Sequence, residues 1–101
     1  MNITVLTPDK KIFNGAIISV KVPGTDGQFQ VLKNHAPIVS SLEKGKVEIV
    51  TSKGKYEFYD SDSGDIVQMD EPGKKITYLI TGGFIEVWNN EVSLLIESLQ
   101  S

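Results

Sequence analysis

The one histidine of this chain, His35, lies in the segment NHAP (residues 34–37), between an amide and an Ala-Pro turn. Imidazole is the side chain most often used for proton transfer near neutral pH, so a catalytic role is weighed first. A Ser-His-Asp triad needs an activated serine, but Ser40 and Ser41 lie in an apolar run without a nucleophile turn. A catalytic zinc site usually draws on several histidines. His35 is therefore expected either to hydrogen-bond nearby backbone within a turn or to form part of an interface.

An acidic stretch, DSDSGDIVQMDE (residues 60–71), has the reach of a calcium-binding loop. If Asp60 is position one, Asp62 falls at position three and Glu71 at position twelve. However, the glycine that such a loop needs at position six stands at position five, as Gly64, and the flanking sequence is typical of strands rather than helices. A solvated hairpin tip is the better interpretation.

The glycines do not form a phosphate-binding loop. Neither PGTDGQF (residues 23–29) nor TGGF (residues 81–84) carries the GK[ST] ending or the strand–loop–helix context that phosphate binding requires. Gly82 and Gly83 are expected instead to mark a bulge or a close backbone approach. With no paired carboxylates in an evident pocket and no nucleophile with its base, the residues indicate a non-catalytic domain that acts through surface contact.

Composition narrows the class of protein. The chain has 101 residues, 40% of them hydrophobic and 23% charged, which predicts one soluble domain spanning residues 1–101. A formal charge of −3 argues against nucleic-acid binding. There is no cysteine, no signal peptide is evident, and no apolar run approaches the ~20 residues of a membrane helix. We expect no metal, no cofactor, no membrane insertion, and a location in the cytosol or on its side of a membrane.

The apolar residues follow a period of two in short runs, which predicts an all-β domain, an antiparallel sandwich or a barrel. The first expected strand contains Ile3–Val5. The others are AIISVKV (16–22), QFQVL (28–32), IVSSL (38–42), KVEIV (46–50), KYEFYD (55–60), IVQM (66–69), ITYLI (76–80), FIEVWN (84–89) and EVSLLIESL (91–99). Turns are predicted at FNG (13–15), at SKG (52–54) and at Asn89–Asn90, the last as a hairpin. The best helix candidate is SLLIESLQS (93–101), which is too short to stand alone.

Three blocks of motifs in order identify a family. LTPDKKIFNG (6–15), VKVPGTDGQFQVLKNHAPIVSSLEKGKVEI (20–49) and YLITGGFIEVWNNEVSLL (78–95) resemble the N-terminal domain of the epsilon subunit of F-type ATP synthase. The family pattern is a TP-like turn, F-x-G, P-G-x-x-G, N-H-A-P, L-x-x-G and G-G-x-x-E-V. The resemblance covers nearly the whole chain and implies a β-sandwich of about ten strands.

The resemblance also implies a function without catalysis. Family members sit at the foot of the central stalk, pack on the gamma subunit and rest against the polar loops of the c-ring, so that ion transport through the ring is coupled to ATP synthesis. It implies a peripheral location on the cytoplasmic face of the membrane. Carried over by motif, the c-ring contacts would be Asp26, Gly27 and Gln28, although many members have a glutamate in place of Gln28. The gamma-facing residues would be Thr7, His35, Ile38, Val39 and Ser40.

Two features depart from the family pattern. The family's usual C-terminal helical hairpin is expected to be absent, since the given sequence ends at Ser101, and neither inhibition by that hairpin nor nucleotide sensing is then expected. The stretch from Tyr59 to Lys75 is longer than the usual connection and is predicted to form an extra hairpin at the edge.

The alternative function is a stand-alone β-sandwich that binds a ligand such as a carbohydrate. Its stacking platforms would be Trp88 together with Tyr56, Tyr59 or Tyr78. Rings buried inside the sandwich would argue against this alternative, whereas a large exposed apolar patch would favour the stalk subunit.

Overall fold

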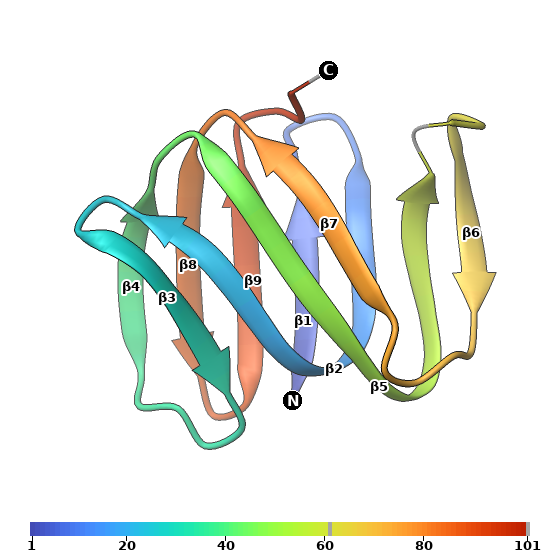
Figure 1. Ribbon diagram of the computed structural model, residues 1–101, viewed down its shortest axis with the longest axis horizontal. Coiled ribbons are helices and arrows are strands. Elements are labelled where there is room, and N and C mark those ends of the chain that lie inside the picture. Colours follow the sequence, from blue (N-terminus) through green and yellow to red (C-terminus); the bar gives the residue numbers. More distant parts are fainter. Residues whose placement is uncertain (61, 101) are drawn as a thin grey trace.

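The computed structural model describes residues 1–60 and 62–100, and within them nine β-strands and no helix (Figure 1). The strands are β1 (Asn2–Leu6), β2 (Lys11–Gly24), β3 (Gly27–Leu32), β4 (Ile38–Leu42), β5 (Gly45–Asp60), β6 (Asp65–Met69), β7 (Lys75–Ile80), β8 (Gly83–Trp88) and β9 (Glu91–Ile96). The all-β prediction is confirmed.

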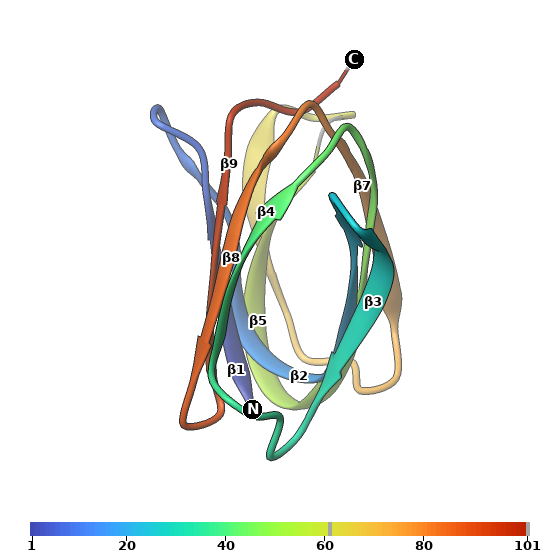
Figure 2. The same cartoon turned by 90° about the vertical axis from the view of Figure 1, so that its left-hand side faces the viewer.

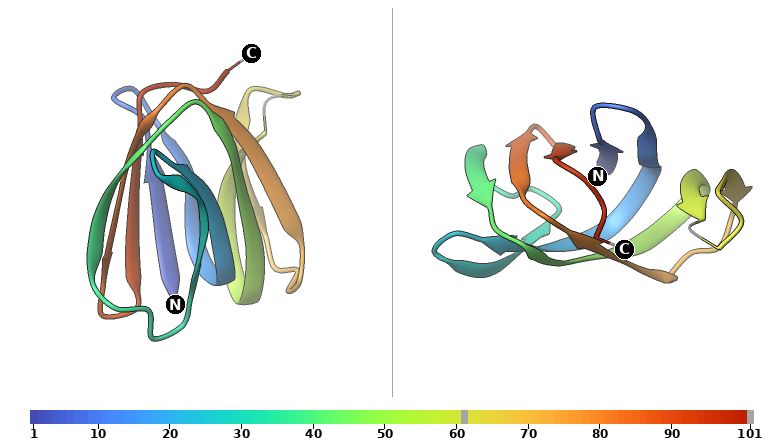
Figure 3. Two further views of the ribbon diagram at one scale, coloured as in Figure 1. Left: turned by 60° about the vertical axis from the view of Figure 1, so that its left-hand side comes forward. Right: turned by 90° about the horizontal axis from the view of Figure 1, so that it is seen from above.

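The strands form two layers that share β2 and β5. The first layer runs β4-β8-β9-β1 and continues through the N-terminal half of β2 and the C-terminal half of β5 to β6. The second layer consists of β3, the C-terminal half of β2, the N-terminal half of β5, and β7. Figures 2 and 3 show the two layers edge-on, so the sandwich is confirmed over the barrel. The named strands pair antiparallel with one exception, since β1 runs parallel to β9.

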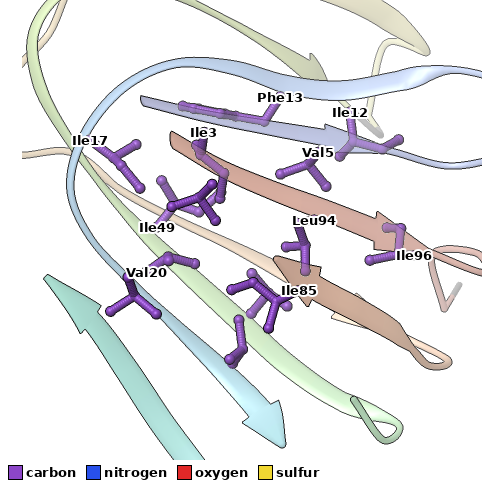
Figure 4. Packing of buried hydrophobic residues seen from close by; sticks show 14 of the residues in the cluster. Ile3, Val5, Ile12, Phe13, Ile17, Val20, Ile49, Ile85, Leu94 and Ile96 are labelled. Carbon is purple, nitrogen blue, oxygen red and sulfur yellow. The ribbon is translucent and has the colours of Figure 1, made fainter. Parts of the chain in front are cut away.

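Aliphatic side chains that alternate along each strand fill the space between the layers (Figure 4). Strand β9 is typical, because Val92, Leu94 and Ile96 point inward while the residues between them face solvent. The largest fully buried side chains are Ile3, Ile12, Phe13, Ile49, Tyr56, Ile80, Ile85 and Leu94. Burying each side chain of this kind contributes about 1.5–3 kcal/mol, so the core fixes which face of every strand remains outside.

Two predicted turns are wrong, because FNG and SKG lie inside the long strands β2 and β5. Gly15 is needed for a close approach rather than a turn: a Cβ there would lie 2.4 Å from the Cβ of Tyr56 on the paired strand. The β2–β5 register shifts between Gly15 and Ser19, where both strands leave one layer for the other. Bulges are a common way to turn such a corner.

The end of the chain also differs from the sequence-based expectation. The segment 93–101, the best helix candidate, forms no helix in its described part. Residues up to Ile96 belong to β9, within the strand expected over 91–99, and Leu99 forms a bridge to Ile80; Ser101 lies outside the described residues. Pairing with β1 on one side and β8 on the other outweighs the modest helix preference of a Leu-rich segment. The Asn89–Asn90 hairpin is confirmed, and both asparagines have positive φ.

The predicted extra hairpin is also confirmed. The C-terminal half of β5 pairs with β6 from Tyr56↔Met69 to Asp60↔Asp65, and β6 is the outermost strand of its layer. Near the hairpin tip the Gly64 amide donates to the carbonyl of Asp60 (2.7 Å) and the Asp62 amide donates to the Asp60 carboxylate (3.0 Å).

Gly83→Ala should severely destabilise the fold. A Cβ at Gly83 would lie 2.1 Å from the Leu95 carbonyl oxygen of the paired strand, and the residue has φ near +155°. We expect a loss of about 3 kcal/mol in the free energy of unfolding, measured by urea denaturation. Gly27→Ala is the control, because Gly27 also has positive φ but no atom within 4 Å of the added Cβ. Equal losses for the two variants would contradict the close-approach argument.

Candidate functional site

The first layer leaves several apolar side chains exposed on its outer side, among polar ones such as Glu86 and Ser93. On β8 the side chains of Phe84 and Trp88 point outward, while Ile85 and Val87 between them are buried. On β9 Leu95 points outward, and on β4 Val39 does. We call the set Leu6, Val39, Phe84, Trp88 and Leu95 the apolar face.

The register of the sheet makes the apolar face continuous. Phe84 lies opposite Leu95, and Leu95 opposite Leu6, so that three apolar side chains follow one row across β8, β9 and β1. Val39 lies opposite Glu86 and therefore diagonal to both Phe84 and Trp88. Diagonal neighbours on a sheet are within reach of aromatic side chains.

Four of the five residues of the apolar face are exposed, and Leu6 is partly buried. The exposed fraction is 74% for Val39, 66% for Trp88 and 55% for Phe84. Single exposed apolar residues are common, but a contiguous group that includes two aromatic side chains is typical of a protein-binding surface.

The outer side of the second layer carries a group of charged residues around Glu48, although Leu32 and Leu79 are also exposed there. Glu48 on β5 accepts ion pairs from Lys75 on β7 (3.4 Å) and from Lys46 (3.5 Å), and Lys21 on β2 lies opposite it. Thr77 flanks Glu48 from the other side. Partial burial acts to raise the pKa of the Glu48 carboxyl, but the hydrogen bond from Lys75 and the positive charges of Lys75, Lys46 and Lys21 together hold it below its ordinary value.

The gamma-facing residues expected from the sequence do not all lie together. His35 lies in the turn between β3 and β4, and Ile38, Val39 and Ser40 follow it along β4. Thr7 lies in the β1–β2 turn, at the opposite end of the sandwich from the β3–β4 turn (Figure 1). Only Val39 of this set belongs to the apolar face.

The turn around His35 is held by backbone and amide hydrogen bonds. The His35 Nδ1 atom lies 2.7 Å from the carbonyl oxygen of Ala36, and the His35 amide donates to the Leu32 carbonyl (3.1 Å). The side chain of Asn90 accepts a hydrogen bond from the Asn34 amide at 2.7 Å, which ties this turn to the β8–β9 hairpin. The prediction that His35 contacts nearby backbone is confirmed; its place in an interface stays a prediction.

The residues expected to face the c-ring form the tip of the β2–β3 turn. Asp26, Gly27 and Gln28 are exposed, and Gly27 has φ +122°. The turn is fixed at its base, because the Thr25 amide donates to the Ser41 carbonyl at 3.2 Å. It is therefore an exposed loop tip on a rigid stem.

The sequence analysis did not identify Leu6, Phe84 and Leu95 as surface residues of interest, and it named Trp88 only as a possible stacking platform. The available signal was the run FIEVW, in which apolar residues occupy both faces of one strand. Alternation identifies the two faces of a strand, but which face is covered depends on the other layer.

The aromatic rings do not form a stacking platform. Tyr56 is buried against Phe13, with ring centroids 5.6 Å apart, and the Tyr78 hydroxyl donates to the Ile12 carbonyl. Lys10 covers the ring of Tyr59 at 4.1 Å. Trp88 is exposed, but it lies on β8 with the apolar face rather than beside a tyrosine. The positions of the tyrosine rings argue against carbohydrate stacking. The exposure of Trp88, taken by itself, does not argue against it.

Taken together, fold and surface define a two-layer β-sandwich that carries an open apolar face. A sequence model of the ATP synthase delta/epsilon chain β-sandwich domain matches residues 1–68. The chain is 37% identical over 95 residues to the ATP synthase epsilon chain of Chlorobaculum tepidum, covering 94% of this chain and 86% of the relative. It is 31% identical over 99 residues to that of Protochlamydia amoebophila, covering 98% of this chain and 54% of the relative. The chain thus spans about half the length of some epsilon chains and most of others.

Solved structures show the same fold. A chain in the central stalk and c-ring structure of Tetrahymena thermophila mitochondrial ATP synthase matches with a TM-score of 0.68 at 20% identity, covering 100% of this chain and 66% of that one. A chain of the Euglena gracilis mitochondrial ATP synthase matches with a TM-score of 0.65 at 22% identity, covering 97% and 51%. This protein belongs to the ATP synthase delta/epsilon chain family. The described residues contain no helix able to cross a membrane.

Glu48→Gln should make stability less sensitive to acid. Because the folded-state pKa of Glu48 is below its ordinary value of 4.5, its contribution is present above that value and is lost as the pH falls through the folded-state pKa. Thermal unfolding between pH 3 and pH 7 should therefore show a shallower acid limb for Glu48→Gln. Glu43→Gln is the control, since Glu43 is exposed and forms no salt bridge in the described part of the chain. Parallel acid limbs for wild type and Glu48→Gln would refute the assignment.

Proposed function

We propose that this protein is a non-catalytic central-stalk subunit of an F-type ATP synthase that couples ion transport to ATP synthesis. The observation that carries the proposal is the apolar face on a member of the delta/epsilon chain family. A stalk subunit needs a rigid body with a broad contact surface, and a sandwich whose layers share two strands supplies one.

The gamma subunit is the proposed partner of the apolar face. Two exposed aromatic side chains, Phe84 and Trp88, lie on either side of the most exposed aliphatic residue, Val39. Aromatic anchors in the centre of an interface account for most binding energy, whereas a polar surface such as the one around Glu48 contributes less. His35 lies beside this surface, because its turn is tied to the β8–β9 hairpin that follows Trp88.

The β2–β3 turn is the proposed contact with the polar loops of the c-ring. Asp26 offers a carboxylate and Gln28 an amide at an exposed tip, and the hydrogen bond between Thr25 and Ser41 holds the tip in place. A fixed loop tip loses little conformational entropy on binding. In this arrangement the protein is peripheral, on the cytoplasmic face of the membrane, and contributes no residues to catalysis.

Replacing Phe84 and Trp88 by alanine should weaken binding to the gamma subunit of the same organism by at least about tenfold, because each anchor loses more than about 1 kcal/mol. Titration calorimetry measures the dissociation constant, and urea denaturation checks that the variant is folded. Thr77→Ala, on the outer side of the second layer, is the matched control and should bind as wild type does. Equal loss in both variants, or none in the first, would refute the apolar face as the gamma contact.

His35→Ala tests the edge of this interface separately. Because His35 contacts mainly its own turn, undiminished binding would remove it as a gamma contact while leaving the apolar face in place.

A cysteine at Asp26 should cross-link to the c-ring in the assembled complex. The chain contains no cysteine, so Asp26→Cys gives a single reactive thiol on the exposed turn. After labelling with a short photoactivatable cross-linker, we expect adducts with c subunits, identified by mass spectrometry. Ser63→Cys, at the tip of the β5–β6 hairpin, is the control and should give none. The reverse pattern would show that the other end of the domain faces the ring.

A further inference from the structure

Strand β6 presents an open sheet edge that the function proposed above does not use. It pairs with β5 alone and lies at the end of the first layer, and Figure 1 shows it as the outermost strand. One side of β6 therefore carries backbone amides and carbonyls with no strand partner in the described part of the chain. Such a row is a template for pairing with another extended segment.

The edge has some of the features by which proteins usually limit such pairing, since it is only five residues long and begins with the charged residue Asp65, but it lacks others. Its sequence, DIVQM, contains neither lysine nor proline, and its register with β5 continues through five residue pairs without a bulge. A regular strand of this kind is open to addition of another strand.

Two apolar rows of the sheet end at β6 without being fully covered. One row runs from Phe13 through Phe58 to Val67, and the other from Tyr56 to Met69. Phe13 and Tyr56 are buried, but Val67 and Met69 at the ends of the rows are only partly so. An added strand with apolar residues at alternate positions would extend both rows and bury their ends.

The charges around the edge of β6 indicate what kind of segment can bind there. Asp60, Asp62 and Asp65 lie at the hairpin tip, and in the described residues none of them lies within 4 Å of a basic group. Asp70 follows the other end of β6. A second copy pairing through β6 would bring carboxylates together, because an antiparallel pairing puts Asp65 of one copy near Asp70 of the other and a parallel one puts Asp65 beside Asp65. Like charges placed this way destabilise a sheet.

We propose that the outer edge of β6 binds a basic extended segment of another protein by strand addition. The segment would carry apolar residues at alternate positions, facing the side of Val67 and Met69, and lysine or arginine residues facing the acidic hairpin tip. The site is independent of the apolar face, which lies on β4, β8, β9 and β1 at the other end of the layer.

A nine-residue peptide with alternating valine and threonine and lysines at its ends is the probe. We expect it to bind the intact chain and to slow hydrogen exchange at alternate amides of β6, observed by NMR. A scrambled peptide of the same composition should not protect these amides. Asp62→Lys combined with Asp65→Lys should weaken binding about fivefold or more at low salt.

Val67→Lys should abolish the protection of the β6 amides by the peptide, because it places a charge on the apolar row that the added strand would extend. Val39→Lys is the matched control: it carries the same change on the apolar face and should leave peptide binding intact. Absence of binding, binding without protection of β6, or concentration-dependent dimerisation with protection of β6 would each overturn the proposal. The first two outcomes leave no strand-addition site, and the third makes a second copy the occupant.

Discussion

The antiparallel pairing of β2 with β5 is the constraint on which the rest of the domain depends. These are the two longest strands, with 14 and 16 residues, and each belongs to both layers. Their register runs from Phe13↔Phe58 in the first layer to Lys21↔Glu48 in the second, with two shifts between Gly15 and Ser19. Because the layers are joined through continuous backbone, their relative orientation does not rest on side-chain packing alone.

A single polar residue secures the corner on the β5 side. Thr51 is fully buried, donates from its hydroxyl to the Glu71 carbonyl (2.6 Å) and accepts from the Lys74 amide (2.9 Å). The Thr51 amide also donates to the Lys74 carbonyl, and the Thr51 carbonyl accepts a hydrogen bond from the Gly73 amide. The connection from β6 to β7 is therefore held against β5 at the point where β5 passes from one layer to the other. A buried hydroxyl with its hydrogen bonds satisfied fixes a local conformation that apolar contact would leave loose.

The sequence was sufficient for the class of fold because the period of two persists through nearly every run, and a strand must bury one face. It was insufficient at the corners and at the C-terminal end. A glycine inside a strand looks like a glycine in a turn until the partner strand is known, and Gly15 is set by Tyr56, some forty residues away. The choice between strand and helix at the end of β9 could not be made from the sequence for the same reason. Its partner β1 comes from the opposite end of the chain, and no local pattern reveals that pairing.

The residues of the candidate interface were also only partly predictable from the sequence. Residues placed by a linear motif, such as Asp26 to Gln28 and His35, could be named from the sequence, but Phe84, Trp88 and Leu95 could not. The run FIEVW has apolar residues on both faces, although Glu86 lies between Phe84 and Trp88 on the outer one. This domain has only two layers, so β8 has one covered face and one open face, and the open face is continued by Val39 and Leu95 on its neighbours. Under the proposed function, a partner would cover the exposed side of β8 as a third layer. A stalk subunit that packs on gamma would bury there the apolar surface that its own fold leaves exposed.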